Sequence, residues 1–150
     1  MLPINVDAAA ELLLHDTDTV LERVSQKSKL SGFAYVFEAG QSEPCFYLAM
    51  DTEDPPADPS TGEWTHPAGF KGDQLSAEWL RVYAKLSNYL EDEDELESRV
   101  EEVHAFLRSV MKRVRERWLA KLPECIFTVN ECNESDEAVL NACSEINGVE

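Results

Sequence analysis

The sequence of 150 residues contains no apolar run of the roughly 18 to 20 residues that a membrane-spanning helix needs. Its first ten residues also lack the basic flank and the apolar stretch that are typical of a signal peptide. We therefore expect a cytoplasmic protein without a membrane partner.

Cysteine and histidine are scarce, and neither occurs at the short spacing of a zinc or redox motif. The residues concerned are Cys45, Cys125, Cys132 and Cys143, together with His15, His66 and His104. The cysteines suit a reducing compartment, where free thiols pack as small hydrophobic side chains. The sequence predicts no disulfide framework, no metal site and no cofactor.

Signatures of catalysis are also missing. The chain has no G-x-S-x-G motif and no glycine-rich phosphate loop, because its glycines are isolated. The histidines stand in no recognisable arrangement with a nucleophile and an orienting group. With 30 acidic residues, carboxylate pairs are too common to indicate a hydrolase. We name no catalytic residue and favour binding over catalysis.

Positive charge is in short supply, since 13 Lys and Arg residues face 30 Asp and Glu residues, for a formal net charge of -17. Such a field repels nucleic acids and accelerates capture of a basic protein. Hydrophobic residues make up 43% of the chain, which is enough for a buried core. The length fits one domain, residues 1–150.

The first half predicts a helix followed by a β-hairpin. Apolar residues recur at helical intervals from Asp7, a candidate cap, to about Ser28, and a polar cluster at 15–19 leaves open whether this helix is split. Phe33–Phe37 and Cys45–Met50 are rich in β-favouring residues and are joined by a short polar loop. We expect these two strands to pair antiparallel.

The second half predicts a long loop and a dominant helix. Residues 51–73 are rich in proline and glycine, which indicates a loop without regular structure. A helix capped by Ser76 follows, and then a long helix from about Asp94 to Lys121. A strand at Ile126–Val129 and a short helix at 137–146 complete the chain. The predicted fold is α+β, with a small antiparallel sheet packed against two to three helices, including the long one.

Two acidic segments are the candidate partner-binding surface. The loop acids surround an aromatic residue with no intervening Lys or Arg, which is typical of a recognition patch. The second segment is the acidic run before the long helix, whose first interpretation is a solvated helix entry. The candidates are Asp51, Glu53, Asp54, Asp58, Glu63, Trp64, Glu91, Asp92, Glu93 and Asp94. The alternative for Trp64 is a ring packed into the core beneath a solvated loop.

Two further features of the long helix admit structural interpretations. The six cations between Arg108 and Lys121 are expected to pair with acids elsewhere in the fold rather than to bind nucleic acid. His104 is expected to be a partly exposed helix residue rather than a ligand.

The order of these features resembles a bacterial domain family of unknown function, the DUF4303 type. The similar parts are the N-terminal helix, Phe33–Phe37, the Trp-bearing loop, the long charged helix, and Ile126–Val129 before a tail ending at Ile146-Asn147. The resemblance implies no catalytic residues, since none is established for that family. By analogy, small acidic α+β proteins also include many immunity proteins of bacterial toxin systems.

The sequence therefore predicts a non-enzymatic acidic binding protein, of the immunity or antitoxin type, that occludes a cationic toxin domain. One alternative is a small enzyme or ligand-binding domain, which converging histidine and carboxylate groups in a concave polar site would reveal. The other is an acidic mimic of nucleic acid, which requires carboxylates at phosphate-like spacing.

Overall fold

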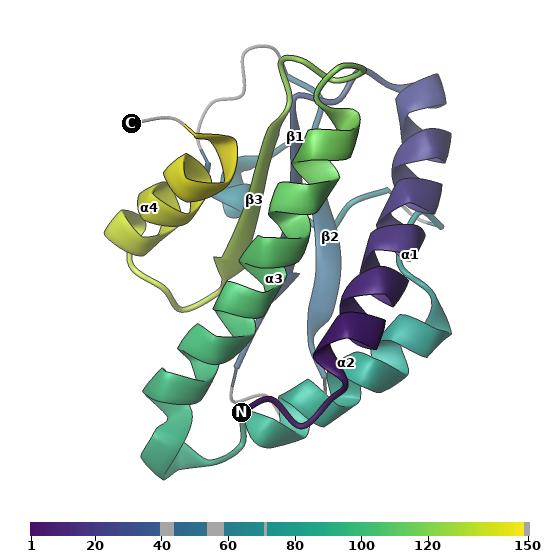
Figure 1. Ribbon diagram of the computed structural model, residues 1–150. Coiled ribbons are helices and arrows are strands. Elements are labelled where there is room, and N and C mark those ends of the chain that lie inside the picture. Colours follow the sequence, from purple (N-terminus) through teal and green to yellow (C-terminus); the bar gives the residue numbers. More distant parts are fainter. Residues whose placement is uncertain (40–43, 54–58, 71, 149–150) are drawn as a thin grey trace.

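The computed structural model describes residues 1–39, 44–53, 59–70 and 72–148 (Figure 1). The candidates Asp54 and Asp58 lie outside these ranges. The helices and strands are α1 (Val6–Lys27), β1 (Gly32–Phe37), β2 (Phe46–Asp51), α2 (Ala77–Tyr89), α3 (Leu96–Trp118), β3 (Ile126–Glu131) and α4 (Asp136–Asn147). Single 3-10 turns, η1 (Thr61–Glu63) and η2 (Glu93–Glu95), precede α2 and α3.

Helix α1 is continuous, which settles whether the polar cluster splits it. Asn5 rather than Asp7 caps the helix, because its side chain accepts a hydrogen bond from the backbone N–H of Ala8. Within the cluster, the Thr17 hydroxyl donates to the Leu13 carbonyl at 2.6 Å, so this polar side chain is satisfied inside the helix.

The sheet has the strand order β2-β1-β3 and is mixed. The hairpin is confirmed, since β1 and β2 pair antiparallel, but the prediction of an antiparallel sheet is wrong for β3, which runs parallel to β1. The reason is the connection through α2 and α3. It returns the chain to the end of the sheet where β1 starts, so that Ile126 pairs with Gly32.

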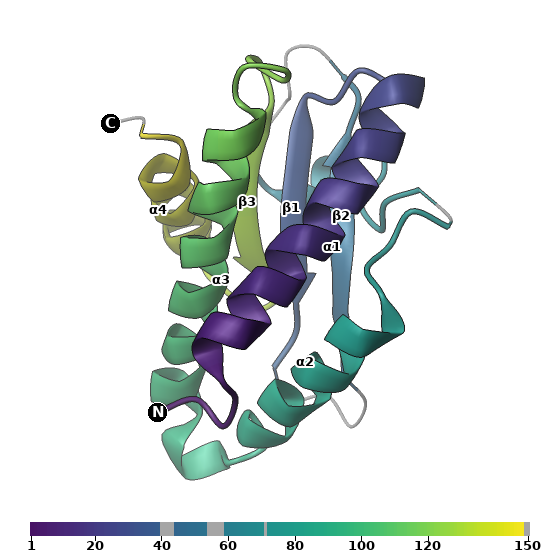
Figure 2. The same ribbon diagram turned by 45° about the vertical axis from the view of Figure 1, so that its right-hand side comes forward.

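Helices α1 and α3 cover one face of the sheet side by side (Figures 1 and 2). The strands present aromatic side chains to this face, among them Phe33, Tyr35 and Phe37, all fully buried. The periodicity of the long helix is confirmed, because Leu107 lies fully buried midway along α3. Within the described residues there are four helices rather than the two to three expected to pack on the sheet, because the short helix predicted at the tail also packs on β3.

The loop after β2 covers the opposite face of the sheet, and so the prediction that it lacks regular structure is wrong in part. It contains η1 and a β-bridge between His66 and Met50. Trp64 packs closely over β1, since a Cβ added at Gly32 would lie 2.9 Å from the Trp64 Cη2. Glycine at position 32 is therefore what allows the ring to approach the backbone.

Across the part of the chain that the structure describes, no helix combines the length and the apolar character that crossing a bilayer requires.

Candidate functional site

Asp51, at the end of β2, is an internal support of the loop. Its side chain is buried, with 1% of the residue exposed. The Oδ1 atom accepts hydrogen bonds from the Thr65 hydroxyl at 3.0 Å and from the backbone N–H groups of Thr65 and Glu53 at 3.3 and 3.2 Å. A carboxylate used in this way organises the backbone around it, and it is not presented to a partner.

Trp64 is 4% exposed and packs against Ala34 and Ala49 on the second face of the sheet. The core alternative for Trp64 is therefore the arrangement that the structure shows. Glu53 and Glu63 are the loop candidates whose side chains are exposed among the described residues. The loop thus presents carboxylates to solvent but not an aromatic ring.

The structure separates the two predicted acidic segments. Glu53 follows the end of β2 beside the start of β1, and Glu63 lies in η1, next to Trp64 on the second face of the sheet, whereas Glu91–Asp94 precede α3 (Figure 1). The C-terminal end of α3 leads into β3 at that same start of β1, and the 23 residues of α3 span about 34 Å. The two segments therefore lie at opposite ends of the molecule and do not form one surface.

We call the acidic surface at the start of α3 the acidic helix end. It comprises Glu91, Asp92, Glu93, Asp94, Glu95, Glu97 and Glu101. Asp92 accepts a hydrogen bond from the backbone N–H of Asp94 at 3.1 Å and pairs with Arg99 at 3.3 Å. Negative charge is favourable here, because the first turn of a helix carries the positive end of its dipole.

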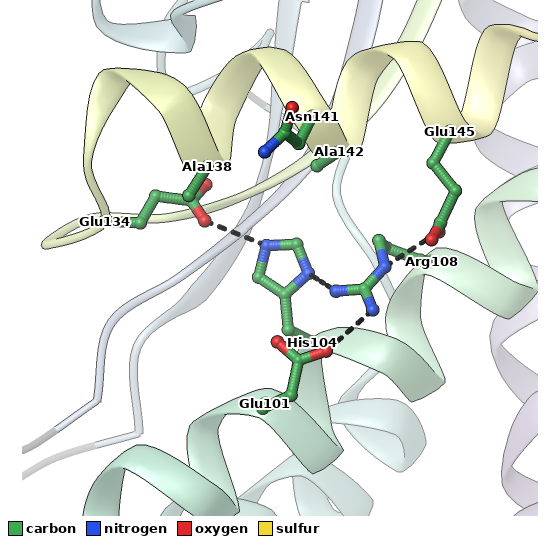
Figure 3. Close-up of a pocket in the computed structure, with 8 residues that line it drawn as sticks. All are labelled: Glu101, His104, Arg108, Glu134, Ala138, Asn141, Ala142 and Glu145. Carbon is green, nitrogen blue, oxygen red and sulfur yellow. Dashed lines mark hydrogen bonds and ion pairs between the residues drawn. The ribbon is translucent and has the colours of Figure 1, made fainter.

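A polar cavity of about 250 Å³ opens beside this surface, between α3 and α4 (Figure 3). Its lining residues are Glu101, His104, Arg108, Glu134, Ala138, Asn141, Ala142 and Glu145. Figure 3 shows the carboxylates of Glu101, Glu134 and Glu145 arranged around a central pair formed by His104 and Arg108. Histidine and carboxylate groups therefore converge in a concave site, as the ligand-binding alternative requires.

Both ring nitrogens of His104 are engaged, one by Arg108 of the same helix and the other by Glu134 of the turn between β3 and α4. The Arg108 Nη1 donates to Nδ1 at 2.5 Å, and Nε2 lies 3.1 Å from the Glu134 Oε2. An arginine can only donate, so Nδ1 is the acceptor and the proton of the neutral ring is assigned to Nε2. The expectation that His104 is partly exposed is wrong, because it is 4% exposed against the start of α4.

Arg108 is held by two further carboxylates. Its Nη2 donates to Glu101 and its Nε to Glu145, both at 2.8 Å. Burial opposes the charge of Arg108, but the hydrogen bonds and charges of Glu101 and Glu145 outweigh it and raise the pKa of the guanidinium. For Glu145, partial burial favours the neutral acid, yet Arg108 and Lys112 lower the pKa of this carboxyl below its ordinary value. The ion pairs are therefore formed at neutral pH.

Sequence reasoning missed this cavity, although half of it is visible in the sequence. Glu101, His104 and Arg108 are spaced by three and four residues, which places them on one face of a helix. The other wall is α4, where Ala138 and Ala142 are one turn apart and too small to fill the space between the helices. No local pattern indicates that α4 packs against this face.

The expected pairing of the cations on α3 is confirmed for four of them. Arg108 and Lys112 pair with Glu145, Arg113 pairs with Glu11, and Arg117 pairs with Asp18.

Within the described ranges, no group of three or more His, Cys, Asp or Glu side chains is arranged to hold a metal ion.

No family model, no curated protein and no solved structure matches this chain.

Proposed function

We propose that this chain is a non-enzymatic acidic protein that binds a basic protein partner, in the manner of an immunity protein or antitoxin that occludes a cationic bacterial toxin. The acidic helix end is the contact surface. The observation that carries this proposal is the charge imbalance there. Among the described residues, Glu91, Glu93, Asp94, Glu95 and Glu97 are exposed and form no ion pair.

The distribution of cations supports the same proposal. Arg23 and Lys27 pair with Asp73, and most cations of α3 are held by acids of α1, α4 or α3 itself. In the part of the chain that the structure describes, Arg99 and Arg108 pair with carboxylates of the acidic helix end, and the Met1 ammonium group pairs with the neighbouring Glu102. Exposed carboxylates without neutralising cations attract a basic partner and accelerate its association.

Binding rather than catalysis is favoured by the chemistry of the cavity. Its lining residues include no Ser, Thr or Cys that a base would activate as a nucleophile. Both nitrogens of His104 are already engaged by Arg108 and Glu134. The cavity itself favours a second candidate function, the binding of a small polar ligand, because its histidine and carboxylate groups converge on a concave site.

A direct test uses the product of the gene next to the one that encodes this chain. We expect its basic domain to bind the purified chain in surface plasmon resonance, and the chain to suppress its toxicity when both are co-expressed. Charge removal at the acidic helix end by Glu93→Gln, Asp94→Asn and Glu97→Gln should weaken both effects. Absence of binding to a basic neighbouring product would contradict the proposal.

A further inference from the structure

The cavity between α3 and α4 has an unequal balance of charge. Three carboxylates, Glu101, Glu134 and Glu145, line it, against the single guanidinium of Arg108 and the neutral ring of His104. Lys112 also pairs with Glu145 from outside the lining, so three acids face two cations and an excess of one negative charge remains. A further anion is therefore disfavoured in this space, and a cation is favoured.

The acceptor capacity of two of these carboxylates, Glu101 and Glu145, is not exhausted. Glu101 and Glu145 are 68% and 45% exposed at their side chains. In Glu101 one oxygen binds Arg108, and in Glu145 one oxygen binds Arg108 and Lys112. An ionised carboxylate offers about four acceptor positions, so each retains sites for a further donor. The groups that face the cavity therefore favour a ligand that donates hydrogen bonds and carries positive charge.

The cavity has the size for the end of one long side chain. Its volume of about 250 Å³ corresponds to roughly eight water molecules, at about 30 Å³ for each. Ala138 and Ala142 keep this space open on the α4 side. A larger residue at either position would extend into it.

The cavity is also continuous with the acidic helix end. Glu101 lines both the cavity and a shallow hollow formed by Asp94, Glu95, Glu97 and Ser98. A basic segment that lies along these acids therefore reaches the mouth of the cavity without crossing a cationic surface. The exposed acids can therefore attract a basic partner over a long range and bring it to the cavity between α3 and α4.

We infer that the cavity between α3 and α4 receives one lysine or arginine side chain of the basic partner, whose ammonium or guanidinium group is bound by Glu101 and Glu145. This inference rests on the proposed function. It assigns specificity to the recess, while the exposed acids of the helix end supply attraction. An arginine anchored in a pocket that excludes water is typical of the residues that dominate an interface.

The test uses two probes, a hexa-arginine peptide and free arginine ethyl ester, with the full chain labelled with nitrogen-15. Ala138→Leu fills the cavity without changing charge, and Ala105→Leu makes the same change on the exposed face of α3. We expect Ala138→Leu to weaken peptide binding at least about tenfold, which is one 1.4 kcal/mol step in affinity, and Ala105→Leu to leave it unchanged. Addition of the peptide should shift the amide signals of Ala138 and Asn141 in the unmodified chain and in the Ala105→Leu variant. The same region should show no shift in the Ala138→Leu variant.

A second variant keeps the test decisive if Ala138→Leu does not fold. Glu101→Gln removes one negative charge of the cavity from an exposed side chain, and it should also lower the affinity for the peptide. If the peptide binds the filled and open cavities equally, yet binds less well after charge removal at Glu93, Asp94 and Glu97, the inference is overturned and the proposed function stands.

Other results distinguish a side chain of a protein partner from a small free cation as the ligand of the cavity. If the peptide does not bind but arginine ethyl ester shifts the cavity amides, the cavity is a small-ligand site and both the inference and the proposed partner fall. If neither probe produces a shift or a binding signal at low salt, the cavity has no affinity for cations and the inference is wrong.

Discussion

Asn147, in the last turn of α4, exchanges two hydrogen bonds with Phe127 on the outer edge of β3. Its Oδ1 accepts from the Phe127 N–H at 3.1 Å, and its Nδ2 donates to the Phe127 carbonyl at 2.7 Å. The amide thus occupies the place of a neighbouring strand. On the other edge of the sheet, Gln74 accepts from the N–H of Leu48 at 3.0 Å. At these positions both edges are closed to strand addition by another chain.

We predict that Asn147→Ala destabilises the protein by about 1 to 3 kcal/mol, because the Phe127 backbone groups lose their partner at a half-buried edge. Hydrogen exchange at the Phe127 amide should accelerate accordingly. The control is Asn88→Ala, which truncates an exposed asparagine on α2. Equal effects of the two substitutions would show that the amide does not close the edge.

Substitution of Leu107 tests the packing of α3. Leu107 is fully buried in the main hydrophobic core, and so Leu107→Ala should cost about 2 to 5 kcal/mol through lost burial and a cavity. Leu80→Ala, at a leucine that is 43% exposed, is the matched control and should change little. Urea denaturation measures both, and a small effect at Leu107 would contradict the described packing.

Trp64→Ala is predicted to act on stability rather than on partner binding alone. Removing a buried ring from the second face of the sheet should cost about 3 to 5 kcal/mol. Gly32→Ala should also destabilise, because the added Cβ would meet Trp64 and Asp51 at 2.9 to 3.0 Å. Denaturation curves decide the matter. Faster dissociation of a partner from a Trp64→Ala chain of unchanged stability would instead place the ring in the contact surface.

The thiol of Cys125 should make the free energy of unfolding depend on pH in the alkaline range. Burial, and to a lesser extent the charge of Asp51, raises the pKa of this thiol to about 12, from an ordinary value near 9. As the pH rises, the thiol loses its proton in the unfolded chain before it does so in the folded chain. The contribution of Cys125 to the free energy of unfolding is therefore complete below pH 9. It falls between pH 9 and 12 by about 1.4 kcal/mol for each pH unit.

Thiol labelling at pH 9 provides the measurement. Exposed Cys132 should react with iodoacetamide well before buried Cys125, which reacts only as the protein unfolds. Similar labelling rates for these two cysteines in the folded chain would show that the Cys125 thiol is accessible.

The sequence is informative where the physical cause is local. The seam that includes Leu107 follows from a spacing of three and four, and the Ser76 cap from one side chain beside a helix start. The direction of β3 depends on the whole connection through α2 and α3, which no pattern within Ile126–Val129 records. The hairpin, by contrast, has a short loop that permits only antiparallel pairing.

The candidate site was harder to predict for the same reason. The loop has the same composition whether Trp64 faces solvent or the sheet, and only the space above Gly32 decides between them. The principal contacts of His104 include Glu134, which lies 30 residues away in the sequence. The acidic run at Glu91–Asp94 was visible, since charge is a property of composition.

The central claim is that the acidic helix end attracts a basic protein, and the association rate at varied salt tests it most directly. Two variants remove equal charge: Glu93→Gln with Asp94→Asn and Glu97→Gln at the helix end, and Glu22→Gln with Glu53→Gln and Glu63→Gln at the far end. Steering is local and screened by salt, so the first variant should associate about tenfold more slowly at low salt, with the difference shrinking at high salt. The far-end variant should resemble the unmodified chain. Equal slowing of both variants, or none, would contradict the assignment of this surface.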